Sequence, residues 1–202
     1  LFTFHTSTQW TKDLSGIAVN ASVRLLSKEE KSLKITETAP LLFTHTGFSG
    51  PAVLRASAWG ARVLAECNYQ CLMEVNFTAN VTEALSYDET LSVLQEFKQH
   101  NGRKTMQSFS LFELPKRLWS ALLENAGIDP EQVWAELNKP QLRRLAEALT
   151  QYRFPIEGKA TFKEEFVTAG GVKLSEINFK TYESKLYPQL YLAGEVLDID
   201  AI

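Results

Sequence analysis

The sequence predicts an α+β fold in which a β-rich domain is interrupted by a small group of helices. Residues 17–78 carry β-branched and alternating apolar side chains, and residues 86–152 carry apolar side chains at helical spacing. Beyond Phe154 and Pro155 the sequence returns to β character, with Thr161, Phe162, Phe166 and Val167. Because β segments flank the helical block on both sides, we expect the helices to be an insertion within the β domain.

The β part begins with two long stretches, 17–26 and 33–43, that are rich in β-branched and apolar residues. The charged connection 27–31 has the length of a hairpin loop, so the two stretches should pair. Residues 69–78 offer a further alternating run. Pro51 predicts the start of a short helix that extends to residue 59, because the fixed φ of proline suits a first helical turn.

The helical block contains start signals for several helices. Ser86 and Glu89 have the spacing of a capping box, in which each side chain satisfies a free amide of the other residue. Asp129 and Pro130 combine an N-cap with a first-turn proline. The four expected helices begin near residues 86, 115, 129 and 140.

Composition limits the classes of function. The chain has 202 residues and a net charge of −3, with no dense basic cluster, which argues against nucleic acid as a partner. No apolar run is long enough for a bilayer, so no membrane partner is expected. Cys67 and Cys71 have no second Cys or His pair nearby, so we predict no metal. With two cysteines and no secretory signal, the expected compartment is the cytoplasm.

Residues 42–51, Leu-Phe-Thr-His-Thr-Gly-Phe-Ser-Gly-Pro, form a strand-to-helix junction with candidate functional side chains. The free amides of a first helical turn can face a polar ligand, which makes Thr44, His45 and Ser49 candidates for a substrate pocket. His45 is the candidate for proton transfer and thus for a catalytic role. The alternatives are a tight turn with a capped helix and a hydrogen-bonded structural histidine.

Two glycine-containing segments lie near the end of the chain. An apolar run at 190–193 is expected to form a strand that ends in Gly194 and presents Glu195 to polyol hydroxyls. Asp198 and Asp200 allow paired metal carboxylates as an alternative, which the absence of an accompanying histidine disfavours; a plain turn is the third interpretation. Gly170 and Gly171 indicate a hairpin or a close crossing of two chain segments.

Four stretches together resemble the YhiN-like flavoproteins, also called BaiN-like or aminoacetone-oxidase-family FAD-binding enzymes. They span residues 42–51, 167–172, 183–185 and 190–200, in the order and spacing of that family. The similarity covers nearly the whole chain, although residues 86–152 contribute little motif content.

The resemblance implies a Rossmann-type FAD domain that is split by a long insertion with a β-barrel-like part and a helical part. Residues 1–85 and 153–185 would form the β-rich insert domain, and residues 86–152 its helical subdomain. Residues 186–202 would return to the edge of the FAD domain, in truncated form.

The resemblance also implies site residues. Glu195 would hold the ribityl chain of FAD, with Gly194, Asp200, Gly170 and Gly171 also at the cofactor. The family's G-x-G-x-x-G segment and its glycine-rich continuation after Asp200 are missing from this sequence. We therefore expect an internal piece of a longer enzyme that does not hold FAD without the remainder of the FAD domain.

The function implied is that of an inserted domain in a FAD-dependent oxidoreductase, which covers the flavin and shapes the pocket for a small-molecule substrate. NAD(P)H is a candidate reductant, and the piece alone is expected to be inactive. The alternative is a non-catalytic protein-interaction module.

Overall fold

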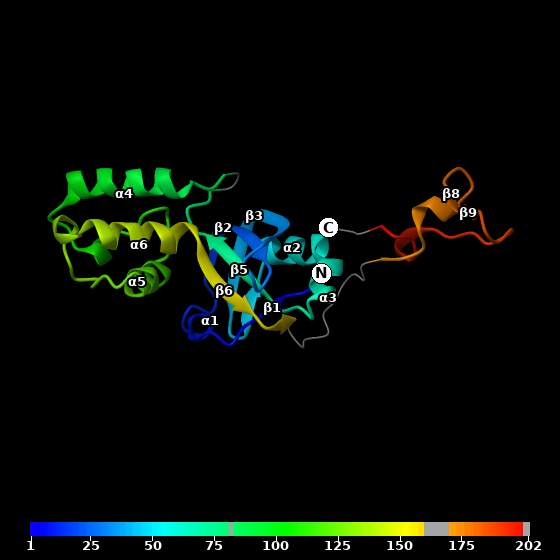
Figure 1. Cartoon of the computed structure of the whole chain (residues 1–202), viewed down its shortest axis with the longest axis horizontal. Coiled ribbons are helices and arrows are strands. Elements are labelled where there is room, and N and C mark those ends of the chain that lie inside the picture. Colours follow the sequence, from blue (N-terminus) through cyan, green and yellow to red (C-terminus); the bar gives the residue numbers. More distant parts are fainter. Residues whose placement is uncertain (81–82, 160–169, 200–202) are drawn as a thin grey trace.

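The computed structural model describes residues 1–80, 83–159 and 170–199. Three parts follow one another along the long axis: a group of helices, a central β part, and a separate C-terminal piece drawn in orange and red (Figure 1). The strands are antiparallel, and the helices α4 to α6 form a part of their own, which confirms the predicted α+β class.

The central part is an antiparallel sheet with the strand order β6-β5-β2-β3-β4-β1-β7. The strands are β1 (Phe4–His5), β2 (Ala18–Leu26), β3 (Ser32–Thr44), β4 (Gly47–Ser49), β5 (Cys71–Asn76), β6 (Tyr152–Ile156) and β7 (Gly158–Lys159). Although β6 and β7 stand at opposite ends of this order, only Glu157 separates them in the chain, and its amide donates to the His5 carbonyl at 2.9 Å. One stretch of chain therefore pairs with both β5 and β1, which closes the sheet into a barrel.

The barrel core follows from side-chain alternation. In β2, Val19, Ala21 and Val23 are buried and the residues between them point outward, as a period of two requires. Both long strands agree with the predicted stretches 17–26 and 33–43. Inside the barrel, the ring centroids of Phe48 and Phe154 lie 4.7 Å apart, and both side chains are fully buried.

Three short helices accompany the barrel: α1 (Gln9–Asp13), α2 (Pro51–Trp59) and α3 (Ala61–Glu66). α2 has the predicted bounds and begins with Pro51 after Gly50. Its small residues Ala52, Val53 and Ala56 are completely buried, so the helix lies close to the strands. Trp59, at the end of α2, is 63% exposed.

The helical part contains α4 (Tyr87–Asn101), α5 (Lys116–Asn125) and α6 (Lys139–Thr150), with the short 3-10 turns η1 (Met106–Ser108) and η2 (Trp134–Glu136). The Ser86–Glu89 capping box is present at α4. The helix expected from residue 129 is wrong, because this segment forms only η2. The amide of Trp134 donates to the Lys104 carbonyl, and Thr105 bridges to Val133, so tertiary pairing takes the backbone groups that a helix would need.

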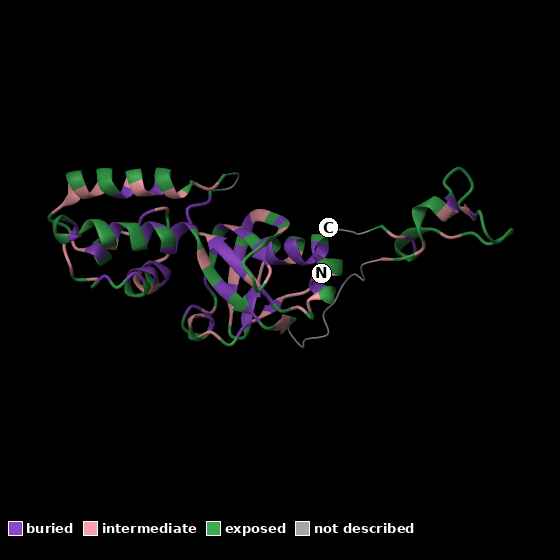
Figure 2. Cartoon of the chain, in the orientation of Figure 1, coloured by how far each residue is buried: buried purple, intermediate pink, exposed green. Residues whose placement is uncertain are grey.

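The C-terminal piece contains β8 (Ile177–Asn178), β9 (Glu183–Ser184) and the 3-10 turns η3 (Leu174–Glu176) and η4 (Gly194–Val196). Most of its residues are exposed, in contrast to the barrel (Figure 2). The β character expected for Thr161, Phe162, Phe166 and Val167 lies outside the described residues. Among the helices described, none is both long and apolar enough to cross a membrane.

Candidate functional site

The structure brings two of the predicted cofactor segments together. Val172 and Leu197 form a parallel bridge, in which the Val172 amide donates to the Val196 carbonyl at 2.9 Å. The Asp198 amide donates back to the Val172 carbonyl, also at 2.9 Å. Gly170 and Gly171 therefore lie beside the segment that carries Gly194 and Glu195. We call residues 170–172 and 194–198 the glycine-loop unit.

Gly171 is required by this crossing. A Cβ atom at this position would lie 2.5 Å from the carbonyl carbon and oxygen of Leu197 and 2.6 Å from the Val196 oxygen. These are backbone atoms, which cannot rotate away as a flexible side chain could. The predicted close crossing of two chain segments at this glycine is thus observed.

The strand expected at residues 190–193 is wrong. Tyr191 makes a single bridge with Glu183, and the chain then turns through η4. The neighbouring strand, β9, is only two residues long, so the ladder stops after this one bridge and the apolar run stays irregular. Glu195 lies within η4 with an exposed side chain. Asp200 lies outside the described residues.

The predicted substrate-pocket residues lie on a different part of the molecule. Thr44 ends β3, Ser49 ends β4, and His45 is exposed in the turn between the two strands. This hairpin packs against β1, where the Thr6 amide donates to the Thr46 carbonyl at 3.0 Å. The expected strand-to-helix junction is present, since α2 follows Gly50. The described contacts thus give the hairpin and the glycine-loop unit different neighbours.

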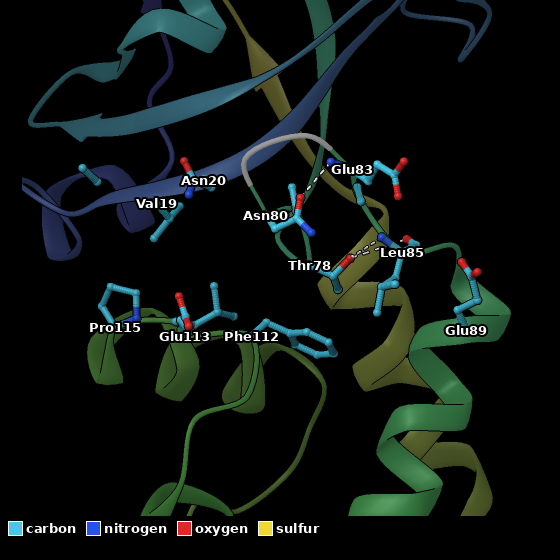
Figure 3. A pocket seen from close by; sticks show the side chains of 14 residues that line it. Val19, Asn20, Thr78, Asn80, Glu83, Leu85, Glu89, Phe112, Glu113 and Pro115 are labelled. Atoms are coloured by element: carbon cyan, nitrogen blue, oxygen red, sulfur yellow. Dashed lines mark hydrogen bonds between the residues drawn. The ribbon is translucent and has the colours of Figure 1, made fainter.

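A cavity of about 630 Å³ lies between the barrel and the helical part, and sequence reasoning missed it. Figure 3 shows its walls: the start of β2, residues 78–80 and 83–85, and the loop before α5. The Leu85 amide donates to the Thr78 hydroxyl at 3.0 Å and fixes one wall. The loop before α5 contributes Phe112 and Glu113, both with positive φ. No motif marks these residues, so only the tertiary structure reveals the cavity.

Glu74 is the most buried carboxylate among the described residues and lies on β5 between two arginines. It accepts hydrogen bonds from Arg24 on β2 and from Arg153 Nε on β6, the latter at 3.1 Å. The bond to Glu74 is also the main cause of the raised pKa of Arg153. The three residues occupy matching positions on adjacent strands, so the network links strands across the barrel wall.

The two cysteines have the character of packed side chains. Burial raises the pKa of the Cys71 thiol to about 12, with a smaller contribution from Cys67. At neutral pH Cys71 is therefore a protonated thiol, the form that does not act as a nucleophile. No group of three or more His, Cys, Asp or Glu side chains suited to a metal occurs among the described residues.

Comparisons with known proteins identify relatives. The "Ribosomal RNA dihydrouridine synthase" of Haemophilus influenzae is 29% identical over 98% of this chain and 44% of its own length. The protein of the same name from Escherichia coli is 32% identical over 79% of the chain and 36% of its own length. The "3-dehydro-bile acid delta(4,6)-reductase" of Clostridium scindens is 29% identical over 93% of the chain and 44% of its own length.

The chain thus spans less than half the length of each of these curated relatives. Residues 1–167 match the family described as "HI0933-like protein barrel and H2TH domain". The matched region contains the closed barrel and the helical part, which agrees with the barrel and the H2TH domain that the description names. The chain therefore belongs to the HI0933-like family, the group that its four motif stretches resemble.

Proposed function

We propose that this chain is part of a FAD-dependent oxidoreductase and that the glycine-loop unit contacts the cofactor. The observation that carries the proposal is the Val172–Leu197 bridge, which joins two segments far apart in sequence at a glycine crossing. Exposed on η4, the carboxylate of Glu195 is able to accept hydrogen bonds from the ribityl hydroxyls of FAD. A Cβ atom at Gly194 or Gly170 would meet no atom within 4 Å, so both leave room for close approach by the cofactor, while Gly171 permits the chain crossing that brings them together. Asp200 is proposed to lie near the cofactor.

The proposed reaction is the reduction of a carbon–carbon double bond. The names of two relatives refer to dihydrouridine, which is uridine with one ring double bond saturated, and a third is named a reductase of Δ4,6 double bonds. Each name describes the addition of two hydrogens across such a bond. When bound and reduced by NAD(P)H, the proposed source of electrons, FAD would supply the hydride. The exposed His45 is our candidate for the proton donor.

A small molecule is the proposed substrate, because the net charge of −3 and the absence of a basic cluster disfavour a nucleic acid. Uridine in RNA is the second candidate, favoured by the names of two relatives. An unsaturated ketone, as the small molecule, and uridine both contain a double bond conjugated with a carbonyl group. Turnover assays with an unsaturated ketone and with an RNA transcript distinguish the two.

We further propose that polypeptide outside this chain completes the FAD site, since the relatives are more than twice as long as the part matched here. The barrel and helical part would then cover the flavin, and the chain alone would be inactive. The cytoplasm is the proposed compartment.

The test is FAD binding to the full-length protein, which is measured by the quenching of flavin fluorescence. We expect Glu195→Gln to weaken FAD binding about 10-fold, because a charge-assisted hydrogen bond becomes a neutral one. Glu176→Gln, in the same C-terminal piece, is the matched control. A full-length protein that binds no FAD, or a Glu195 variant with unchanged affinity, contradicts the proposal. A stable protein partner without redox activity would instead favour an interaction module.

A further inference from the structure

The C-terminal piece, residues 170–199, shares no hydrophobic core with the barrel. Among the described residues, the main core cluster extends from Phe4 to Ile156 and includes no member of this piece. Within the piece, only Ile177, Ser184 and Leu197 are buried. Apolar burial therefore does not determine how the piece is oriented on the barrel. Within the described residues, a directional polar contact can do so instead.

Such a contact is present between α3 and the glycine-loop unit. A terminal guanidinium nitrogen of Arg62 lies 2.8 Å from Oδ1 and 2.9 Å from Oδ2 of Asp198. The Asp198 side chain is only 26% exposed, whereas that of Arg62 is 73% exposed. The carboxylate is thus partly shielded from water, which strengthens the attraction relative to a fully solvated pair.

The position of Asp198 is coupled to the rest of the unit. Its amide donates to the Val172 carbonyl, and the preceding Leu197 is buried and bridged to Val172. Gly171 lies directly against the backbone of Val196 and Leu197. Asp198 therefore cannot move far without moving both segments of the unit, including η4 with Glu195.

We propose that Arg62 is a positioning residue, which fixes the glycine-loop unit against α3 through Asp198. Arg62 itself need not touch the cofactor. Its effect on FAD rests on the proposed function, because it acts by orienting Glu195. The effect of Arg62 on the orientation of the C-terminal piece does not depend on the proposed function. This effect is measurable in the chain without any cofactor.

The experiment is hydrogen–deuterium exchange of the 202-residue chain, read from peptides that cover residues 170–178 and 190–199. In Arg62→Ala we expect exchange in these peptides to accelerate about two- to fivefold, the range of a partly exposed ion pair. Exchange in β2 and β3 should stay unchanged. Arg55→Ala, which removes an exposed arginine from the neighbouring α2, is the matched control and should have no effect.

Charge reversal separates positioning from a general structural effect. Arg62→Asp and Asp198→Arg should each accelerate exchange, and the double variant should restore it, because the ion pair is re-formed with opposite polarity. If Asp198→Arg unfolds the piece, Asp198→Asn must reproduce the pattern of Arg62→Ala. Equal exchange in Arg62→Ala and Arg55→Ala, or an Asp198→Asn variant without acceleration, overturns the proposal. Failure of FAD binding in the full-length protein would contradict the proposed function and leave this result intact.

Discussion

Gly47 shows how one residue controls the barrel at the residue scale. It lies at the start of β4, paired with His5 of β1. A Cβ atom here would lie 1.9 Å from the Phe4 carbonyl oxygen and 2.8 Å from its carbon. Since both are backbone atoms of the paired strand, a side chain can be admitted only if β1 and β4 separate. The glycine in the Thr-Gly-Phe-Ser motif is therefore explained by barrel packing.

We predict that Gly47→Ala lowers the free energy of unfolding by about 1–3 kcal/mol, the usual cost of overpacking. Chemical denaturation monitored by circular dichroism measures this change. Gly158→Ala is the matched control, because Gly158 also pairs with His5, but a Cβ atom added to it would meet no other atom within 4 Å. Equal stability of the two variants would show that β1 relaxes without cost.

At the element scale, two helices begin with capping boxes of different chemistry. At α4 the box joins Ser86 and Glu89, and at α6 it joins Asn138 and Gln141. The hydrogen bond from Ser86 is the main cause of the lowered pKa of Glu89. Since Gln141 does not titrate, only the α4 box can make stability depend on pH.

We predict that Glu89→Gln is less stable than the wild type at pH 7 and equally stable in strong acid. Because the pKa of Glu89 is lowered on folding, its stabilising effect is complete above the unfolded value, near 4.5, and is lost as the pH falls through the folded value. Thermal unfolding between pH 7 and pH 3 measures the difference. Gln141→Glu is the control for the other box. A difference between wild type and Glu89→Gln that stays constant over this range would contradict the assignment.

Local signals predicted the elements and the hairpin of β2 and β3 well, and pairing between distant segments poorly. The Ser86 box, the Pro51 start of α2 and the alternation in β2 act within a few residues, so the sequence reveals them. The helix expected from residue 129 failed because Trp134 bonds to Lys104, a partner distant in sequence. The strand expected at 190–193 failed because its neighbour β9 is only two residues long and pairs with it at a single bridge, a length that no local pattern predicts.

The candidate-site residues also divide into those that a local signal marks and those that only the tertiary structure brings together. Gly171 was expected at a close crossing, because glycine permits one, but its partner Leu197 was not foreseen. The Arg62–Asp198 pair and the cavity beside Glu113 had no motif to mark them. Roles of Thr44, His45, Ser49 and Glu195 stay predictions that the cofactor and turnover experiments address.

At the scale of the whole molecule, the barrel and the helical part behave as one packed unit. Their buried residues form a single core cluster. The Phe77 amide, just after β5, donates to the Leu149 carbonyl of α6 at 2.7 Å. The Trp10 and Tyr152 rings stack at 4.4 Å, while the Tyr152 hydroxyl accepts a hydrogen bond from Asn125 of α5. Neither part can lose its structure without exposing apolar surface of the other.

We predict that the two parts unfold in one transition. In one variant, Trp119 and Trp134 are replaced by Phe, so that the remaining Trp10 and Trp59 report on the barrel. In the reciprocal variant, Trp10 and Trp59 are replaced by Phe, so that the buried Trp119 and Trp134 report on the helical part. In each variant, the urea midpoint measured by fluorescence should coincide with the midpoint measured by circular dichroism, because a shared core makes unfolding cooperative. Midpoints of fluorescence and circular dichroism that separate would show that the helical part is an independent folding unit. The cavity between the two parts would then lie at a boundary that opens on its own.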